Sequence, residues 1–135
     1  MMELSDEVRK AIEHCEEYAY ELLTETGESY PFGAFIDTIG NVHPMEMEID
    51  KKNIPNIGKV IDTLKQFGEE EMNAGRMKAY ALCYEVSYQL SEEDEPKDAI
   101  AIDLKHIEET TPLFYLPFEK KEEMEIEDLF AVARS

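Results

Sequence analysis

The sequence predicts an α+β domain with two main helices and a mostly antiparallel sheet of about five or six strands. Apolar residues recur with the helical period in two separate segments of the chain. The other segments alternate apolar and polar residues between short turns, which is typical of strands joined as hairpins. The expected order is helix, strand, strand, helix, strand, strand, strand, within a single domain over residues 1–135.

The first helix is predicted to begin after Ser5 and to end near Gly27. Ser5 is a favoured N-cap residue, and Asp6 and Glu7 add negative charge where the helix dipole stabilises it. The apolar stripe consists of Val8, Ala11, Ile12, Cys15, Ala19, Leu22 and Leu23. Pro31 prevents continuation, because a residue before proline avoids helical geometry.

A hairpin follows, with strands predicted over residues 32–39 and 42–49 and a turn over 38–41. Pro44 has no backbone N–H to donate to a neighbouring strand. The second strand is therefore expected to be an edge strand or to contain a bulge.

The second helix is predicted to start at an Asn53 cap, with Pro55 near its beginning, and to end at Gly75. Its expected apolar stripe consists of Ile57, Val60, Ile61, Leu64, Phe67 and Met72.

Two long strands are predicted over residues 78–90 and 99–107, joined by an acidic turn over 91–96. Each strand carries alanines on one of its faces. In the first strand the opposite face consists of Tyr80, Leu82, Tyr84, Val86, Tyr88 and Leu90. Small residues let a helix approach closely, so we expect helix packing on the alanine face. The tyrosine face is either a second covered face or a binding surface.

A further strand is predicted over residues 113–118, and the last segment fits two structures. The spacing of Ile126, Leu129, Phe130 and Ala133 fits a helix, whereas the spacing of Met124, Ile126, Phe130 and Val132 fits a strand. A turn at residues 120–123 favours the strand, and hence a terminal hairpin.

The chain is acidic throughout, with 32 Asp and Glu residues against 13 Lys and Arg and a formal net charge of −19. Such a field repels nucleic-acid phosphates and anionic membranes, so we expect neither as a partner. It attracts a basic protein surface or cations. Solubility alone explains the charge equally well.

The sequence features are typical of a cytoplasmic protein. The N-terminus shows no basic start followed by an apolar run, and no segment reaches the roughly 20 apolar residues of a membrane span. Cys15 and Cys83 are the two cysteines, and we expect both to be buried and reduced.

The sequence contains no recognisable catalytic, metal or cofactor motif. His14, His43 and His106 fall on three different predicted elements. His14 and Cys15 are adjacent on a helix and therefore point in different directions. We expect no catalytic residue, no bound metal and no cofactor.

Two sets of residues are candidates for binding a partner. Glu13, Glu17, Glu21 and Glu25 recur every four residues, and we call them the glutamate ladder. The ladder is either an anionic stripe for a basic partner or a solvated helix face. Tyr80, Tyr84 and Tyr88 form a stripe that is either an aromatic binding surface or part of the core.

Three short motifs occur in the order Tyr30-Pro31-Phe32-Gly33-Ala34, Asp98-Ala99-Ile100 and Leu116-Pro117-Phe118. Over most of its length the chain resembles a group of small uncharacterised bacterial α+β proteins, which implies no particular activity. The element order is similar to that of roadblock-type and profilin-like modules. Because such modules dimerise and scaffold other proteins, that resemblance implies a homodimer as one assembly state.

These observations favour a non-catalytic protein-binding module, of immunity or inhibitor type, that binds a basic partner. The alternative is a small enzyme or ligand-binding protein with a pocket at the tyrosine-rich sheet face. A cleft with converging polar groups would favour the alternative.

Overall fold

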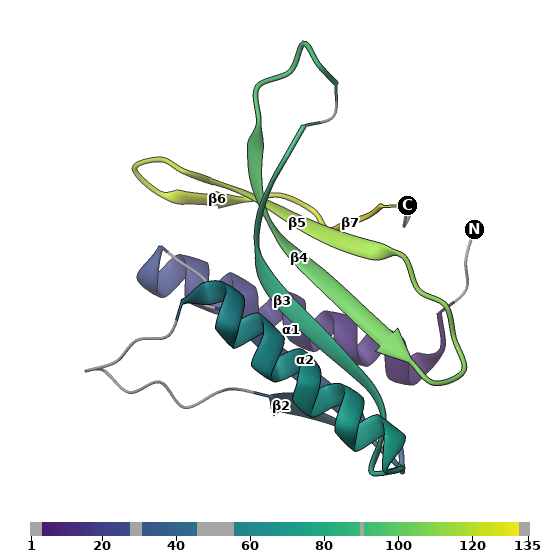
Figure 1. The fold of residues 1–135 in the computed structure, drawn as a ribbon. Coiled ribbons are helices and arrows are strands. Elements are labelled where there is room, and N and C mark those ends of the chain that lie inside the picture. Colours follow the sequence, from purple (N-terminus) through teal and green to yellow (C-terminus); the bar gives the residue numbers. More distant parts are fainter. Residues whose placement is uncertain (1–3, 28–30, 46–55, 90, 133–135) are drawn as a thin grey trace.

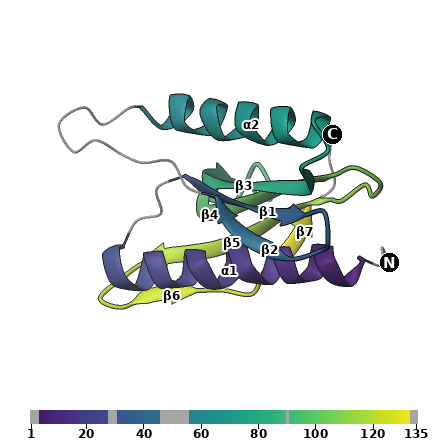
Figure 2. The ribbon, with the colours of Figure 1, turned by 90° about the horizontal axis from the view of Figure 1, so that it is seen from below.

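The computed structural model describes residues 4–27, 31–45, 56–89 and 91–132. Two helices lie on opposite faces of one antiparallel sheet and give the molecule three layers (Figures 1 and 2). Helix α1 (Asp6–Thr26) packs on one face, and α2 (Ile57–Asn73) packs on the other. The predicted α+β class and element order are confirmed.

The sheet has seven strands, and all of its strand pairs are antiparallel. Its spatial order is β2 (Val42–Met45), β1 (Phe32–Asp37), β3 (Met77–Tyr88), β4 (Lys97–His106), β5 (Leu113–Lys120) and β6 (Met124–Ile126), with β7 (Phe130–Val132) also paired to β5.

Helix α1 has the ends that the sequence predicts. The Ser5 hydroxyl accepts a hydrogen bond from the Val8 N–H at 3.4 Å. Gly27 is left-handed, with φ of 76°, and its N–H donates to the Leu23 carbonyl. Both groups therefore satisfy backbone atoms that the helix leaves without partners.

Helix α2 begins later than predicted. Its cap is Asn56, whose side-chain oxygen accepts from the Lys59 N–H at 2.8 Å. The predicted cap, Asn53, lies outside the described residues. Asn56 is itself a favoured cap residue one helical turn further on, so local sequence alone did not separate the two.

The apolar stripe of α2 also differs from the prediction. Ile57 and Phe67 are exposed, whereas Val60, Leu64 and Gly68 are buried. A Cβ atom at Gly68 would lie 2.5 Å from Cγ of Tyr80, so glycine lets the helix lie directly on the tyrosine ring.

The β1–β2 hairpin confirms the prediction from Pro44, because β2 is an edge strand. Strand β1 ends at Asp37 and not at residue 39, since the Asp37 carboxylate accepts from the N–H groups of Ile39 and Asn41 and forms the turn. The predicted continuation of β2 lies outside the described residues.

The register between β3 and β4 assigns the alanines to different faces. Ala81 pairs with Leu104, whereas Tyr84 pairs with Ala101. Directly paired residues share a face, so the alanines of β3 and β4 lie on opposite faces. Helix α1 covers the alanines of β3, as expected for that strand, whereas the alanines of β4 share the tyrosine face.

The C-terminal segment forms strands and confirms the predicted hairpin. Phe118 pairs with Ile126, and Tyr115 pairs with Phe130. Between these two pairs the outer segment has three residues, whereas β5 has two. The outer segment therefore contains one extra residue, and β6 and β7 form one strand interrupted by a bulge. This bulge contains Glu127 and Asp128.

The larger part of the core lies between α1 and the sheet, and it contains both cysteines. Cys15 on α1 and Cys83 on β3 are fully buried, which confirms that prediction, and neither forms a disulfide. Burial and the neighbouring Cys15 thiol raise the pKa of Cys83. A smaller cluster lies between α2 and β3 and includes Tyr80 and Leu82.

Candidate functional site

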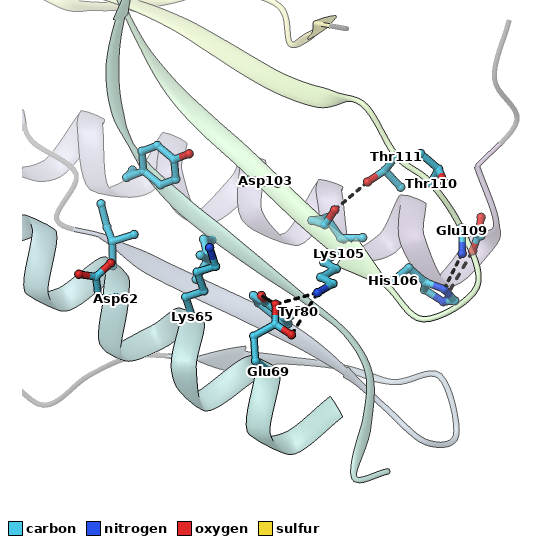
Figure 3. Close-up of a pocket in the computed structure, with 14 residues that line it drawn as sticks. Asp62, Lys65, Glu69, Tyr80, Asp103, Lys105, His106, Glu109, Thr110 and Thr111 are labelled. Atoms are coloured by element: carbon cyan, nitrogen blue, oxygen red, sulfur yellow. Dashed lines mark hydrogen bonds and ion pairs between the residues drawn. The ribbon is translucent and has the colours of Figure 1, made fainter. Parts of the chain in front are cut away.

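The central pocket lies between α2 and the strands β3 and β4, and it has a volume of about 540 Å³ (Figure 3). Helix α2 supplies Asp62, Lys65 and Glu69 to one wall. The other wall is formed by strand residues and the segment after β4, including Tyr80, Tyr84, Asp103, Lys105, His106, Glu109, Thr110 and Thr111.

Glu69 organises the middle of this pocket. Its carboxylate accepts hydrogen bonds from the Tyr80 hydroxyl at 2.7 Å and from the Lys105 ammonium at 2.8 Å. The bond from Lys105, followed by that from Tyr80, lowers the pKa of Glu69. Burial, followed by the bond to Glu69, raises the pKa of Tyr80. Lys105 and Glu69 thus form an ion pair across the pocket, and Tyr80 bonds to the same carboxylate.

His106 joins the end of β4 to the start of α1. Its Nδ1 accepts from the N–H groups of Glu108 and Glu109, at 3.0 and 3.2 Å. An accepting Nδ1 carries no proton, so the proton of neutral His106 is on Nε2, which lies 3.2 Å from a Glu7 carboxylate oxygen. The imidazole side chain is 4 % exposed and has a structural role.

Two polar groups of the pocket are hydrogen-bonded to the protein backbone. The Thr111 hydroxyl donates to the Leu104 carbonyl at 2.7 Å, and His106 is held by backbone N–H groups. Within the described ranges, no group of three His, Cys, Asp or Glu side chains could hold a metal ion. A pocket with converging polar groups at the tyrosine face is the feature expected of the alternative, a small enzyme or ligand-binding protein.

A second hollow, the acidic groove, runs between α1 and the bulged outer strand and has a volume of about 360 Å³. Its lining residues are Glu16, Glu17, Tyr20, Glu21, Leu116, Ile126, Glu127 and Asp128. Five of these are carboxylates, and none of the described lining residues is Lys or Arg. Tyr20, Leu116 and Ile126 give the groove an apolar part.

The pKa of Glu16 reflects the negative charge of the groove. Partial burial raises its pKa, and repulsion from Glu13, Asp128 and Glu17 raises it further. The carboxylates of α1 and the bulge therefore repel one another.

The glutamate ladder is exposed along its whole length, but its members have different surroundings. Glu17 and Glu21 line the acidic groove. Glu13 lies at another hollow beside the β1–β2 turn, which Glu17 also lines and which contains Lys10. Glu25 lies outside both.

The tyrosine stripe divides in the same way. Tyr80 is 3 % exposed beneath α2 and belongs to the core. Tyr84 is half-buried and lines the central pocket. Tyr88 contacts the rings of Tyr115 and Phe130, which sequence reasoning did not connect with it.

Sequence reasoning did not assign Glu16, Tyr20, Leu116, Ile126, Glu127 and Asp128 to a site, although all of them line the groove. Glu127 and Asp128 come from the far end of the chain. The apolar residues of the last segment fit both a helical spacing and a strand spacing. A strand with one extra residue produces this mixed pattern, and the structure contains such a strand. An extra residue in an outer strand indicates a bulge, and bulges redirect side chains.

No protein-family model, curated protein or solved structure matches the chain. Neither α1 nor α2 is long and apolar enough to cross a membrane.

Proposed function

We propose that this protein is a non-catalytic module that binds a basic segment of another protein in the acidic groove. One observation carries the proposal: carboxylates from α1 and from the bulge line a groove that has an apolar part and, among the residues that the structure describes, no basic side chain. An immunity- or inhibitor-type role toward a basic partner fits this surface.

The groove suits a Lys or Arg side chain in both chemistry and shape. The aliphatic stem of such a side chain can lie along Leu116 and Ile126 while its charged end reaches the carboxylates. The ring of Tyr20, which is 54 % exposed, can add a cation–π contact. A bound cation would also relieve the repulsion that raises the pKa of Glu16.

The net charge of −19 supports a basic protein as the partner, in preference to nucleic acid or an anionic membrane. A cytoplasmic location is part of the proposal, because both cysteines are free thiols, as is usual in a reducing compartment.

The experiment compares three versions of the protein as bait in lysate from the source cells. The test variant is Glu17→Gln with Glu21→Gln, and the matched control is Glu13→Gln with Glu25→Gln. Both remove two ladder charges from the same helix, but only the first pair lines the groove. We expect the test variant to lose the captured partner, with an affinity reduced about tenfold, and the control to retain it. Capture should weaken at high salt.

Equal losses in the two variants would show that capture follows overall charge and not the groove. Full retention of the partner by the test variant would refute the proposal, provided that circular dichroism shows both variants folded.

A further inference from the structure

The sheet face on the side of α2 is only partly covered. Helix α2 packs against β1 and β3, and no other described helix lies over β4, β5 and β7 on that face (Figure 1). Direct pairing places Tyr84, Ala101, Tyr115 and Phe130 in one row across four strands. Together with Tyr88, the three aromatic residues of this row form what we call the aromatic patch.

Three rings of the aromatic patch contact one another, and those of Tyr88 and Tyr115 meet across β4. The ring centroids of Tyr88, Tyr115 and Phe130 are separated by 5.5 to 5.8 Å. Ala99 and Ala101 are fully buried on this face, where no described helix covers them. The rings thus shield the alanines, but they remain half-buried themselves and present an aromatic surface to solvent. Partly exposed tyrosines of this kind are enriched at protein interfaces.

The width of the uncovered face matches one helix. Strands lie about 4.8 Å apart, so the midline of β4 and β5 is about 10 Å from the midline of β1 and β3, above which α2 lies. Neighbouring packed helices have axes about 8–10 Å apart. A helix over β4 and β5 would therefore also contact the side of α2 that carries Ile61, Asp62 and Lys65.

The charge around this face indicates the kind of helix. The central pocket adjoins the patch at Tyr84, and it contains four carboxylates and two lysines. The edge hollow, lined by Tyr88, Lys97, Pro117, Glu127, Asp128 and Phe130, has two carboxylates and one lysine. A second copy of this chain would bring another net charge of −19, which disfavours its association here.

We propose that the aromatic patch binds an amphipathic helix from another protein, with an apolar stripe flanked by Lys or Arg. The apolar stripe would cover the patch, and the basic flanks would face the carboxylates of the central pocket and the edge hollow. The patch lies on the opposite sheet face from the acidic groove, and Glu127 and Asp128 line both the groove and the edge hollow. The inference does not require that the groove binds a partner.

The test uses a peptide of about 14 residues made only of Leu and Lys, arranged so that Leu forms one helical face. A peptide of the same composition in scrambled order is the control. Amide chemical shifts of the isotopically labelled protein are followed during titration, with Ala101 and Tyr115 as reporters. We expect these reporters and the Ile61 side of α2 to shift with the helical peptide, and the scrambled peptide to shift them far less.

Two variants make the same chemical change at different places. Tyr84→Lys adds a positive charge within the patch, whereas Phe67→Lys adds it on an exposed aromatic position of α2 outside the patch. We expect the first to weaken the titration at Tyr115 about tenfold and the second to change it less than about twofold.

Shifts confined to α1 and β6 would overturn the inference and leave the acidic groove as the site for basic segments. Equal binding of the two peptides would also overturn it. Sedimentation that shows a dimer of the free protein, lost in the Tyr84→Lys variant, would show that a second copy occupies the patch instead. The titration of the unmodified protein decides the matter even if Tyr84→Lys does not fold.

Discussion

Glu16 illustrates how a single residue reports on the acidic groove. It is not a member of the glutamate ladder, yet its pKa is raised by burial and by Glu13, Asp128 and Glu17. Asp128 is far away in the sequence and reaches this helix only because the outer strand contains a bulge. Periodicity predicted the exposed ladder, but it could not predict which carboxylates from elsewhere would join it.

Replacing Glu16 with Gln should stabilise the protein at neutral pH. The folded-state pKa lies above the unfolded value, so the fold favours the neutral form, and stability is lost as pH rises through the two values. Gln is always neutral and avoids that loss. We expect a gain of about 0.2–0.5 kcal/mol at pH 7, comparable to removal of one repulsive helix pair, and almost none below pH 4.5.

Urea unfolding of this variant and the unmodified protein at pH 7 and pH 4 measures the difference. Glu25→Gln, at an exposed position outside the groove, is the control. A gain for Glu16→Gln that is the same at both pH values would contradict the expectation.

The cysteines show the same limit of residue-scale prediction. Their apolar neighbours indicated that Cys15 and Cys83 are buried, and both are. The sequence could not show that the two thiols lie against each other, one from a helix and one from a strand. Contacts of this kind depend on how whole elements dock.

Helices and strands were predicted best where local chemistry sets their ends. Ser5 and Gly27 define α1 through hydrogen bonds to nearby backbone groups. Alternation within β3 also predicted its two faces. Alternation in two separate strands does not reveal their relative register, however, and the pairing of Tyr84 with Ala101 was therefore not predictable.

Helix α2 provides a prediction about packing between elements. Gly68 is buried at the contact with Tyr80, where a Cβ atom would lie within 2.5 Å of the ring. We expect Gly68→Ala to destabilise the protein by about 1–3 kcal/mol, because the forced movement of α2 outweighs the gain in helix propensity of about 1 kcal/mol. Thermal and denaturant unfolding measure the change.

Gly58→Ala is the matched control on the same helix. A Cβ atom there meets only the Asn56 side-chain oxygen, at 3.4 Å, so the substitution should be neutral or stabilising by up to about 1 kcal/mol. A stabilising effect of Gly68→Ala would show that the helix does not need this close approach.

At the scale of the whole molecule, both edges of the sheet discourage pairing with another strand. Strand β2 carries Pro44 at one edge, and the bulge interrupts the strand formed by β6 and β7 at the other. Prolines and bulges at edges reduce edge-to-edge association. Partners are therefore expected on the two faces, at the acidic groove and the aromatic patch.

The net charge of −19 surrounds both surfaces and leads to a prediction that separates stability from binding. Replacing Glu17 and Glu21 with Lys turns two of the three repulsive ladder pairs into opposite-charge pairs and leaves one like-charge pair, between positions 17 and 21. We expect a stabilisation of about 0.5–1 kcal/mol at low salt. The gain should shrink toward zero in about 1 M salt, where charges are screened within about 3 Å. Denaturant unfolding at the two salt concentrations measures it.

Glu92→Lys with Glu93→Lys makes the same change in net charge within an exposed turn and is the control for overall charge. If the turn variant is stabilised as much as the ladder variant, the effect comes from the net charge and not from the helix. If the ladder variant is less stable than the unmodified protein, repulsion within the ladder is not the largest contribution of these side chains to the free energy of unfolding. If it is more stable and also loses the basic partner, the ladder reduces stability and serves binding, because the same pair of substitutions then stabilises the fold and removes the function.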